Sequence, residues 1–377
     1  MTKEKILKKL NKSKDYILFT LIFILFLLPF LKEFYPTAIL FFNNDYKILR
    51  ILGGTGSYFF IITFTIKFYN STNKKYFLKE NLPIFLLLMY MIWTFISCFF
   101  AENKDYAFVG TPYRKEGFFT YIYYSGIFGL AYCIDSKKIK KALLYSYISI
   151  AIFTIILVQI SNYANINNLV YDKDITVISF SQFNHYGYYL MLGTIFSALL
   201  FITEKNKIFK ILSCLMYTFL LFFLIYNNTF GCYLALFSTL ILYLTISIIK
   251  KGKKLYISLA ITILIIISVF VNHGNNTNIA SENIQTFAKD VKNIATINSS
   301  DKVFESAGTG RMKLWKYGMK FFLEKPILGH GPENLGHKYG EAHINSDRPH
   351  NLLIQLLTTS GIPGFLLYCS AIRFVSF

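Results

Sequence analysis

The stretch SAGTGRMKLWKYGMKFFLEKPILGHGPENLGHKYGEAHINSDRPHNLLIQLLTTSGIPGF, residues 306–365, determines how the rest of the chain is organised. It forms most of the second half of a polar segment, residues 272–350, and then returns to an apolar run. Five of the six histidines lie within or at the end of this polar segment: His273, His330, His337, His343 and His350. We therefore expect the reactive side chains to lie there, and the remainder of the chain to anchor them in lipid.

The composition is that of an integral membrane protein. Hydrophobic residues make up 54%, aromatic residues 18% and charged residues 16% of the chain, which is far from the balance of a soluble domain. Short Lys-rich spacers separate the apolar runs, so we expect one polytopic domain. The apolar run 16–31 has no small-residue cleavage site, which favours a retained helix over a removed signal peptide.

The apolar runs predict an all-α fold of about ten transmembrane helices, taking roughly twenty residues for each span. Nine of them fall in residues 1–271, residues 272–350 form a large loop with short amphipathic helices, and residues 351–377 hold the last span. The predicted spans are 16–31, 51–68, 82–100, 118–134, 142–161, 177–203, 211–226, 229–249, 255–271 and 351–373.

Lysine is concentrated in alternate loops, as expected when cytoplasmic loops carry the positive charge. The basic loops are the amino-terminal segment and the loops near residues 74–79, 137–141, 205–210 and 250–254. The sequence therefore predicts a multi-pass protein of the cell membrane with a cytoplasmic amino terminus and an extracytoplasmic loop at 272–350. The net charge of +19 follows from this topology and indicates no nucleic-acid partner.

We expect neither a metal nor a cofactor. The five cysteines lie in or beside apolar runs without metal-like spacing, and the carboxylates of Asp172 and Asp174 supply too few oxygen ligands for a hard cation. An outward-facing site has no access to nucleotide sugars, ATP or NAD, which are cytoplasmic. Such a site needs a donor activated in the membrane, of which polyprenyl-phosphate-linked sugars are the common class.

The run that begins at Arg311 has the pattern of an amphipathic helix on the outer membrane surface. Thr309 offers an N-cap and Pro326 ends the run. The apolar residues that recur at helical spacing are Met312, Leu314, Trp315, Met319, Phe322 and Leu323.

Two residues of the polar segment are candidates for chemistry. Arg311 lies near a helix amino end, where free N–H groups favour an anion and a guanidinium suits phosphate. His350 lies where the loop meets the last span, and its imidazole suits proton transfer from a hydroxyl or contact with phosphate. The structural alternatives are a lipid head-group contact for Arg311 and a helix cap for His350.

Asn184 and His185 lie inside a predicted span, just below the outer surface. Polar groups at that depth line a cavity or bond to a neighbouring helix. We favour a place in the wall of a substrate cleft, with helix association as the alternative.

Residues 311–364 resemble the signature of the O-antigen ligase and O-antigen polymerase superfamily, which includes bacterial O-linked protein oligosaccharyltransferases. Weaker likenesses are SFSQFNHYG at 179–187 and GTPYRKEGFFTYIYY around Arg114. The features that carry the resemblance are the Gly-Arg start at Arg311, Trp315, Pro326, the Gly-x-Gly turn at Gly329 and Gly331, the pair His350 and Asn351, and the GIPG that follows.

This resemblance implies a metal-independent, inverting transfer of a glycan from a polyprenyl-pyrophosphate carrier to an acceptor hydroxyl, in a helical membrane glycosyltransferase fold. Arg311 matches a pyrophosphate contact and His350 a residue essential at the reacting centre. Family ligases carry a second Arg where this chain has Phe230, so we expect Arg114 or Arg348 to supply the missing cation. The substrate-binding residues expected in addition are Asn351, Asn184, His185 and Trp315.

Family members usually continue with further helices, so we expect the chain ending at Phe377 to be a truncated one. We favour a polysaccharide polymerase, because the second ligase-type Arg is missing. A ligase or a protein oligosaccharyltransferase differs only in the acceptor. The alternatives from other classes are a polyprenyl-glycan flippase, which the lack of an internal repeat disfavours, and a catalytically inactive scaffold.

Overall fold

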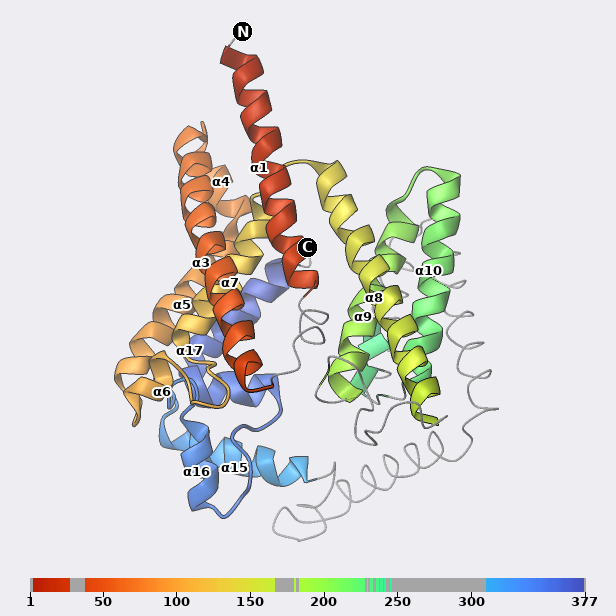
Figure 1. The fold of residues 1–377 in the computed structure, drawn as a ribbon. Coiled ribbons are helices and arrows are strands. Elements are labelled where there is room, and N and C mark those ends of the chain that lie inside the picture. Colours follow the sequence, from red (N-terminus) through yellow and green to blue (C-terminus); the bar gives the residue numbers. More distant parts are fainter. Residues whose placement is uncertain are drawn as a thin grey trace. The chain divides into compact units, whose positions relative to one another are not determined.

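The computed structural model describes residues 3–27, 38–166, 180, 183–227, scattered positions between 229 and 245, and 310–375. Every regular element within these ranges is an α-helix (Figure 1). The helices are α1 (Lys3–Phe26), α3 (Ala38–Asn70), α4 (Lys74–Glu80), α5 (Leu82–Phe99), α6 (Lys104–Phe108), α7 (Phe118–Tyr132), α8 (Lys137–Ile166), α9 (Phe183–Thr203), α10 (Lys207–Tyr226), α15 (Arg311–Glu324), α16 (Leu335–Glu341) and α17 (Leu352–Val375).

Six helices in the described part of the chain are long and apolar enough to cross a membrane. Two predicted spans fall on helices that are not among these six. Helix α7 has only 15 residues, and α1 begins in the Lys-rich amino-terminal segment. The predicted spans 229–249 and 255–271 lie mostly or wholly outside the described residues, so the number ten stays a prediction. The spans are Tyr46–Asn70, Leu82–Phe99, Lys137–Ile160, Asn184–Thr203, Lys207–Tyr226 and Leu352–Arg373.

The chain divides into two compact units, and the first comprises residues 1–41 and 134–285. In it α9 and α10 form a hairpin that packs with α8 around fully buried apolar side chains such as Ile148, Leu190 and Leu220. Helix α1 is joined to the start of α8 by the buried carboxylate of Asp15, which accepts backbone N–H bonds from residues 135 and 136 at 3.2 and 2.8 Å. A carboxylate at this position also stabilises the amino end of α8, where the helix dipole is positive.

The second unit comprises residues 42–133 and 286–377 and holds the described part of the polar segment, from residue 310 on. Its helices α3 and α7 cross at glycines, and a Cβ on Gly53, Gly56 or Gly126 would lie 2.5 Å or less from an atom of the facing helix. Small residues allow such a close approach between helices in a membrane. The Ser57 hydroxyl adds a bond to the carbonyl oxygen of residue 122 at 3.1 Å.

Helix α17 is broken in its middle, at Gly361 (φ 66°) and Pro363. The break frees backbone carbonyls, and the turn after α15 satisfies them: the N–H groups of His330 and Gly331 donate to the carbonyls of residues 358 and 359 at 2.8 and 2.9 Å. Helix α5 contributes Trp93, whose indole N–H donates to the Ser360 carbonyl at 2.8 Å. The turn, α5 and α17 are therefore held together by hydrogen bonds.

The helix predicted to begin at Arg311 is confirmed as α15, but its predicted N-cap is wrong. The cap position is Gly310, with φ 82° and no side-chain bond, because helical geometry starts only at Arg311. Thr309 lies one residue too early to serve and is outside the described residues.

The crossing of α3 and α7 predicts different effects for two adjacent glycines. Gly53→Ala places a Cβ 2.5 Å from the Cβ and carbonyl oxygen of Tyr123, whereas a Cβ at Gly54 meets nothing within 4 Å. We expect Gly53→Ala to destabilise the protein by about 1–3 kcal/mol. The control Gly54→Ala should leave it unchanged or raise its stability by up to ~1 kcal/mol.

Thermal unfolding of the detergent-solubilised protein measures both effects. Equal midpoints for the two variants would contradict the close crossing.

Candidate functional site

Three loops of the second unit meet at the site: the loop between α6 and α7, the turn between α15 and α16, and the loop between α16 and α17. Each contains a residue other than glycine at positive φ: Lys115 at 56°, Glu333 at 56°, and His343 and His350 at 55° and 49°. Such conformations are uncommon for residues with a side chain and often occur at functional sites. The backbone here is therefore set by tertiary contacts more than by local preference.

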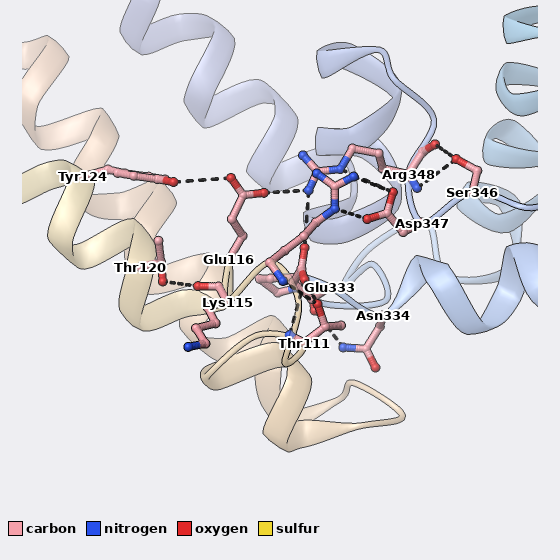
Figure 2. Close-up of polar contacts among 12 residues, drawn as sticks. Thr111, Lys115, Glu116, Thr120, Tyr124, Glu333, Asn334, Ser346, Asp347 and Arg348 are labelled. Atoms are coloured by element: carbon pink, nitrogen blue, oxygen red, sulfur yellow. Dashed lines mark hydrogen bonds and ion pairs between the residues drawn. The ribbon is translucent and has the colours of Figure 1, made fainter. Parts of the chain in front are cut away.

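Asn334 fixes the turn between α15 and α16. Its side chain accepts the N–H of Asn103 at 2.8 Å and donates to the carbonyls of Asn103 and Pro332 at 3.2 and 2.8 Å. Glu333 then points at the loop before α7, where the Thr111 hydroxyl and N–H both donate to its Oε2, at 2.6 and 3.3 Å. Figure 2 shows Glu333 and Thr111, which come from segments far apart in sequence.

Two arginines from different loops form the charged centre of the site. Arg348 Nη2 lies 2.6 Å from Glu116 Oε2 and 3.6 Å from Glu333 Oε1. Arg114 forms an ion pair with Asp347, including a hydrogen bond from Nη2 to Oδ1 at 3.1 Å. Burial works against the charged form of Arg348, but the hydrogen bond and charges of its carboxylate neighbours outweigh burial and raise its pKa.

The surroundings of His350 favour the neutral form of its imidazole. Partial burial lowers its pKa below the ordinary 6.5, the charge of Asp347 opposes the shift, and the positive charges of three arginines add to it. The three are Arg348, Arg114 and Arg311. A neutral imidazole is able to accept a proton, as a general base must.

The site opens into a polar pocket of about 380 Å³. An apolar pocket of about 460 Å³ adjoins it, and Tyr121, Leu352 and Gln355 line both. The apolar pocket is bounded by α3, α5, α7 and α17 and includes Phe60, Leu87 and Phe128. The polar pocket is lined by Glu116, Tyr121, Glu333, Arg348, His350, Asn351, Leu352 and Gln355.

His330 supports the turn from within the protein and does not line either pocket. Its ring is 1% exposed, its Nε2 lies 2.8 Å from the Phe321 carbonyl, and burial lowers its pKa. Lys338 joins the nearby Glu324 and Glu102 at 2.8 and 3.4 Å. This cluster holds α15, α16 and the end of α5 together.

The predicted site residues of the polar segment take different places. Arg348, His350 and Asn351 line the polar pocket, and the Asn351 side chain also caps α17 by accepting the N–H groups of residues 353 and 354 at 3.0 and 3.3 Å. Arg311 does not line the pocket, although its charge reaches His350. Trp315 lies on α15, also outside the pocket lining.

Other predictions concern the first unit or residues outside the described part. Asn184 and His185 lie at the start of α9 in the first unit, so their role stays a prediction. His273, Phe230 and the pair Asp172 and Asp174 lie outside the described residues. Within the described ranges, no three His, Cys, Asp or Glu side chains are arranged to hold a metal ion.

Sequence reasoning missed Glu116, Glu333, Tyr121 and Gln355, all of which line the polar pocket. Glu116 lies two residues after Arg114. Because the loop of Arg114 was already predicted to contribute to the site, Glu116 could have been predicted with it. Glu333 follows the Gly-Pro turn, where nothing local indicates that its side chain reaches Thr111.

The charges around His350 predict pKa changes of opposite sign. Arg311→Gln removes a positive charge that lowers the pKa, so the pKa should rise; Asp347→Asn removes a negative charge that raises it, so the pKa should fall further. Titration of the His350 imidazole by NMR measures both.

The control is Lys79→Gln, beyond the other end of the 18-residue helix α5 and so roughly 27 Å along that helix from the site. It should leave the His350 titration unchanged. Shifts of the same sign in the Arg311 and Asp347 variants would contradict the described surroundings of the imidazole.

Comparison with known families gives a match in the second half of the chain. Residues 215–369, from α10 to α17, match the family model described as O-antigen ligase. No curated protein and no solved structure was found to match the chain. The matched range contains Arg311, Glu333, Arg348 and His350, and the resemblance noted in the sequence is confirmed. With six helices able to span a membrane, the chain is a multi-pass membrane protein whose residues 215–369 are similar to the O-antigen ligase family.

Proposed function

We propose that the protein is a polysaccharide polymerase of the cell envelope. It joins polyprenyl-pyrophosphate-linked glycan units on the outer face of the cytoplasmic membrane, by a metal-independent, inverting glycosyl transfer. The amino terminus is cytoplasmic and the polar segment 272–350 is extracytoplasmic, as the distribution of lysine indicates.

The observation that carries this proposal is the pairing of a polar pocket with an adjoining apolar pocket, in a chain that matches the O-antigen ligase family. A lipid-linked glycan has the same two parts, an isoprenoid tail and a polar head. His350 and Arg348 line the polar pocket, where the head would react.

In the proposed reaction the oxygen of an acceptor hydroxyl attacks the anomeric carbon of the donor sugar from the face opposite the pyrophosphate. The bond between that carbon and the pyrophosphate oxygen breaks, and its electron pair leaves with the pyrophosphate. The hydroxyl proton passes to the neutral imidazole of His350. Arg311, with Arg114 or Arg348, balances the charge that develops on the departing group.

The positively charged groups must exchange partners for this to happen. Arg348 is paired with Glu116 and Arg114 with Asp347, so a bound pyrophosphate would replace a carboxylate at one of these guanidiniums. Arginine suits this exchange because its planar fork binds carboxylate and phosphate in similar geometry.

The choice of polymerase over ligase or protein oligosaccharyltransferase rests on Phe230, which replaces a cation that family ligases carry. A flippase is the alternative from another class. Transporters place polar sites at broken helices near the membrane midplane. Helix α17 is broken, but its freed carbonyls are already bonded within the protein and so are not available to a substrate.

One lipid-linked repeat unit supplied to the purified protein in proteoliposomes tests the proposal. Growth of chains without any other acceptor is expected from a polymerase. His350→Ala should lower the rate about 100-fold or more, because general bases contribute roughly 10²–10⁴-fold.

His337→Ala is the matched control, since this exposed imidazole on α16 lies beside Glu341 and outside the pocket. It should keep full activity. Transfer only to an added acceptor would indicate a ligase, and undiminished chain growth in His350→Ala would overturn the catalytic assignment.

A further inference from the structure

The polar pocket contains more hydrogen-bond acceptors than a pyrophosphate site should. Its charged side chains are two carboxylates, Glu116 and Glu333, and one guanidinium, Arg348. Carboxylates accept hydrogen bonds and donate none, so this lining offers acceptors to a neutral group rich in hydroxyls.

Glu333 lines this pocket, and its two carboxylate oxygens have different partners. Its side chain is 9% exposed, and Thr111 provides two hydrogen bonds to Oε2. The other oxygen, Oε1, lies 3.6 Å from Arg348, which already donates to Glu116 at 2.6 Å. Oε1 is therefore fixed in position and has capacity to accept a further hydrogen bond.

Gln355 supplies a second acceptor from a different element. It lies on α17, where the polar and apolar pockets adjoin, and its buried Oε1 has no hydrogen-bond partner in the described part of the chain. An unsatisfied buried acceptor is costly, and most such groups in proteins have a partner. A ligand hydroxyl or amide N–H would satisfy it.

We propose that the polar pocket is a sugar subsite in which Glu333 and Gln355 accept hydrogen bonds from a hydroxyl or amide N–H of the donor glycan. This inference rests on the proposed function and refines it. The sugar next to the pyrophosphate occupies the pocket beside His350, and the pyrophosphate lies between this sugar and the isoprenoid, where the polar and apolar pockets adjoin. Glu333 and Gln355 then select the glycan, while the apolar pocket and the arginines bind any donor of this class.

The test compares two probes: the lipid-linked repeat unit, and polyprenyl pyrophosphate without a glycan. Glu333→Gln keeps an oxygen for Thr111 but presents an amide N–H₂ to the pocket, which turns an acceptor into a donor. Gln355→Leu removes the second acceptor at nearly constant size. Each should weaken binding of the lipid-linked repeat unit about tenfold or more, as expected for one lost hydrogen bond, and leave binding of polyprenyl pyrophosphate unchanged.

Glu341→Gln, an exposed carboxylate on α16 outside the pocket, is the control and should change neither affinity. Equal weakening of both probes by Glu333→Gln, or none by either variant, would overturn the sugar subsite. Should Glu333→Gln fail to fold, Gln355→Leu alone decides between these outcomes. Failure of the unmodified protein to bind either probe would instead overturn the proposed function.

Discussion

The backbone carbonyls released by the break in α17 are the constraint on which the second unit depends. Inside a membrane no water is available to satisfy them, so the protein must supply donors. The turn after α15 does so with the N–H groups of His330 and Gly331, and α5 does so with Trp93. A Cβ at Gly361 would lie 2.0 Å from the Ile327 carbonyl oxygen, so the approach of the turn to the break requires glycine there. The same bonds fix the turn that carries Glu333 and thereby one wall of the polar pocket.

The fixed turn positions the charged residues of the site through a series of contacts. Asn334 ties the turn to the residues after α5, and Glu333 reaches the loop before α7 through Thr111. That loop carries Glu116, which pairs with Arg348 from the loop before α17. Three segments distant in sequence are thus joined by a short chain of hydrogen bonds and ion pairs, and His350 lies where they meet. The low pKa of its imidazole is a product of this assembly, because burial and the surrounding arginines both favour the neutral form.

Much of this architecture could be predicted from residue patterns, and the rest required contacts between distant segments. Apolar runs predicted the membrane helices, and the spacing around Trp315 predicted α15. The boundary between the polar segment and the last apolar run correctly indicated that His350 lies at the entry to the last helix. The span 351–373 was predicted to be continuous across Gly361, although Gly and Pro two residues apart are a local signal for a break. Glu333 had no such signal, since its role depends on Thr111, 222 residues earlier in the chain. Arg311 does not line the pocket, although its charge lowers the pKa of His350, so its predicted contact with pyrophosphate stays a prediction.

The central claim is that the paired pockets of the second unit bind a lipid-linked glycan with its head group beside His350. A cryo-electron microscopy structure of the protein with a non-reacting polyprenyl-pyrophosphate sugar tests it most directly. The account predicts density for the isoprenoid among α5, α7 and α17, leading past Gln355 to the sugar at His350 and Glu333. Density for the ligand elsewhere, with both pockets unchanged, would contradict it.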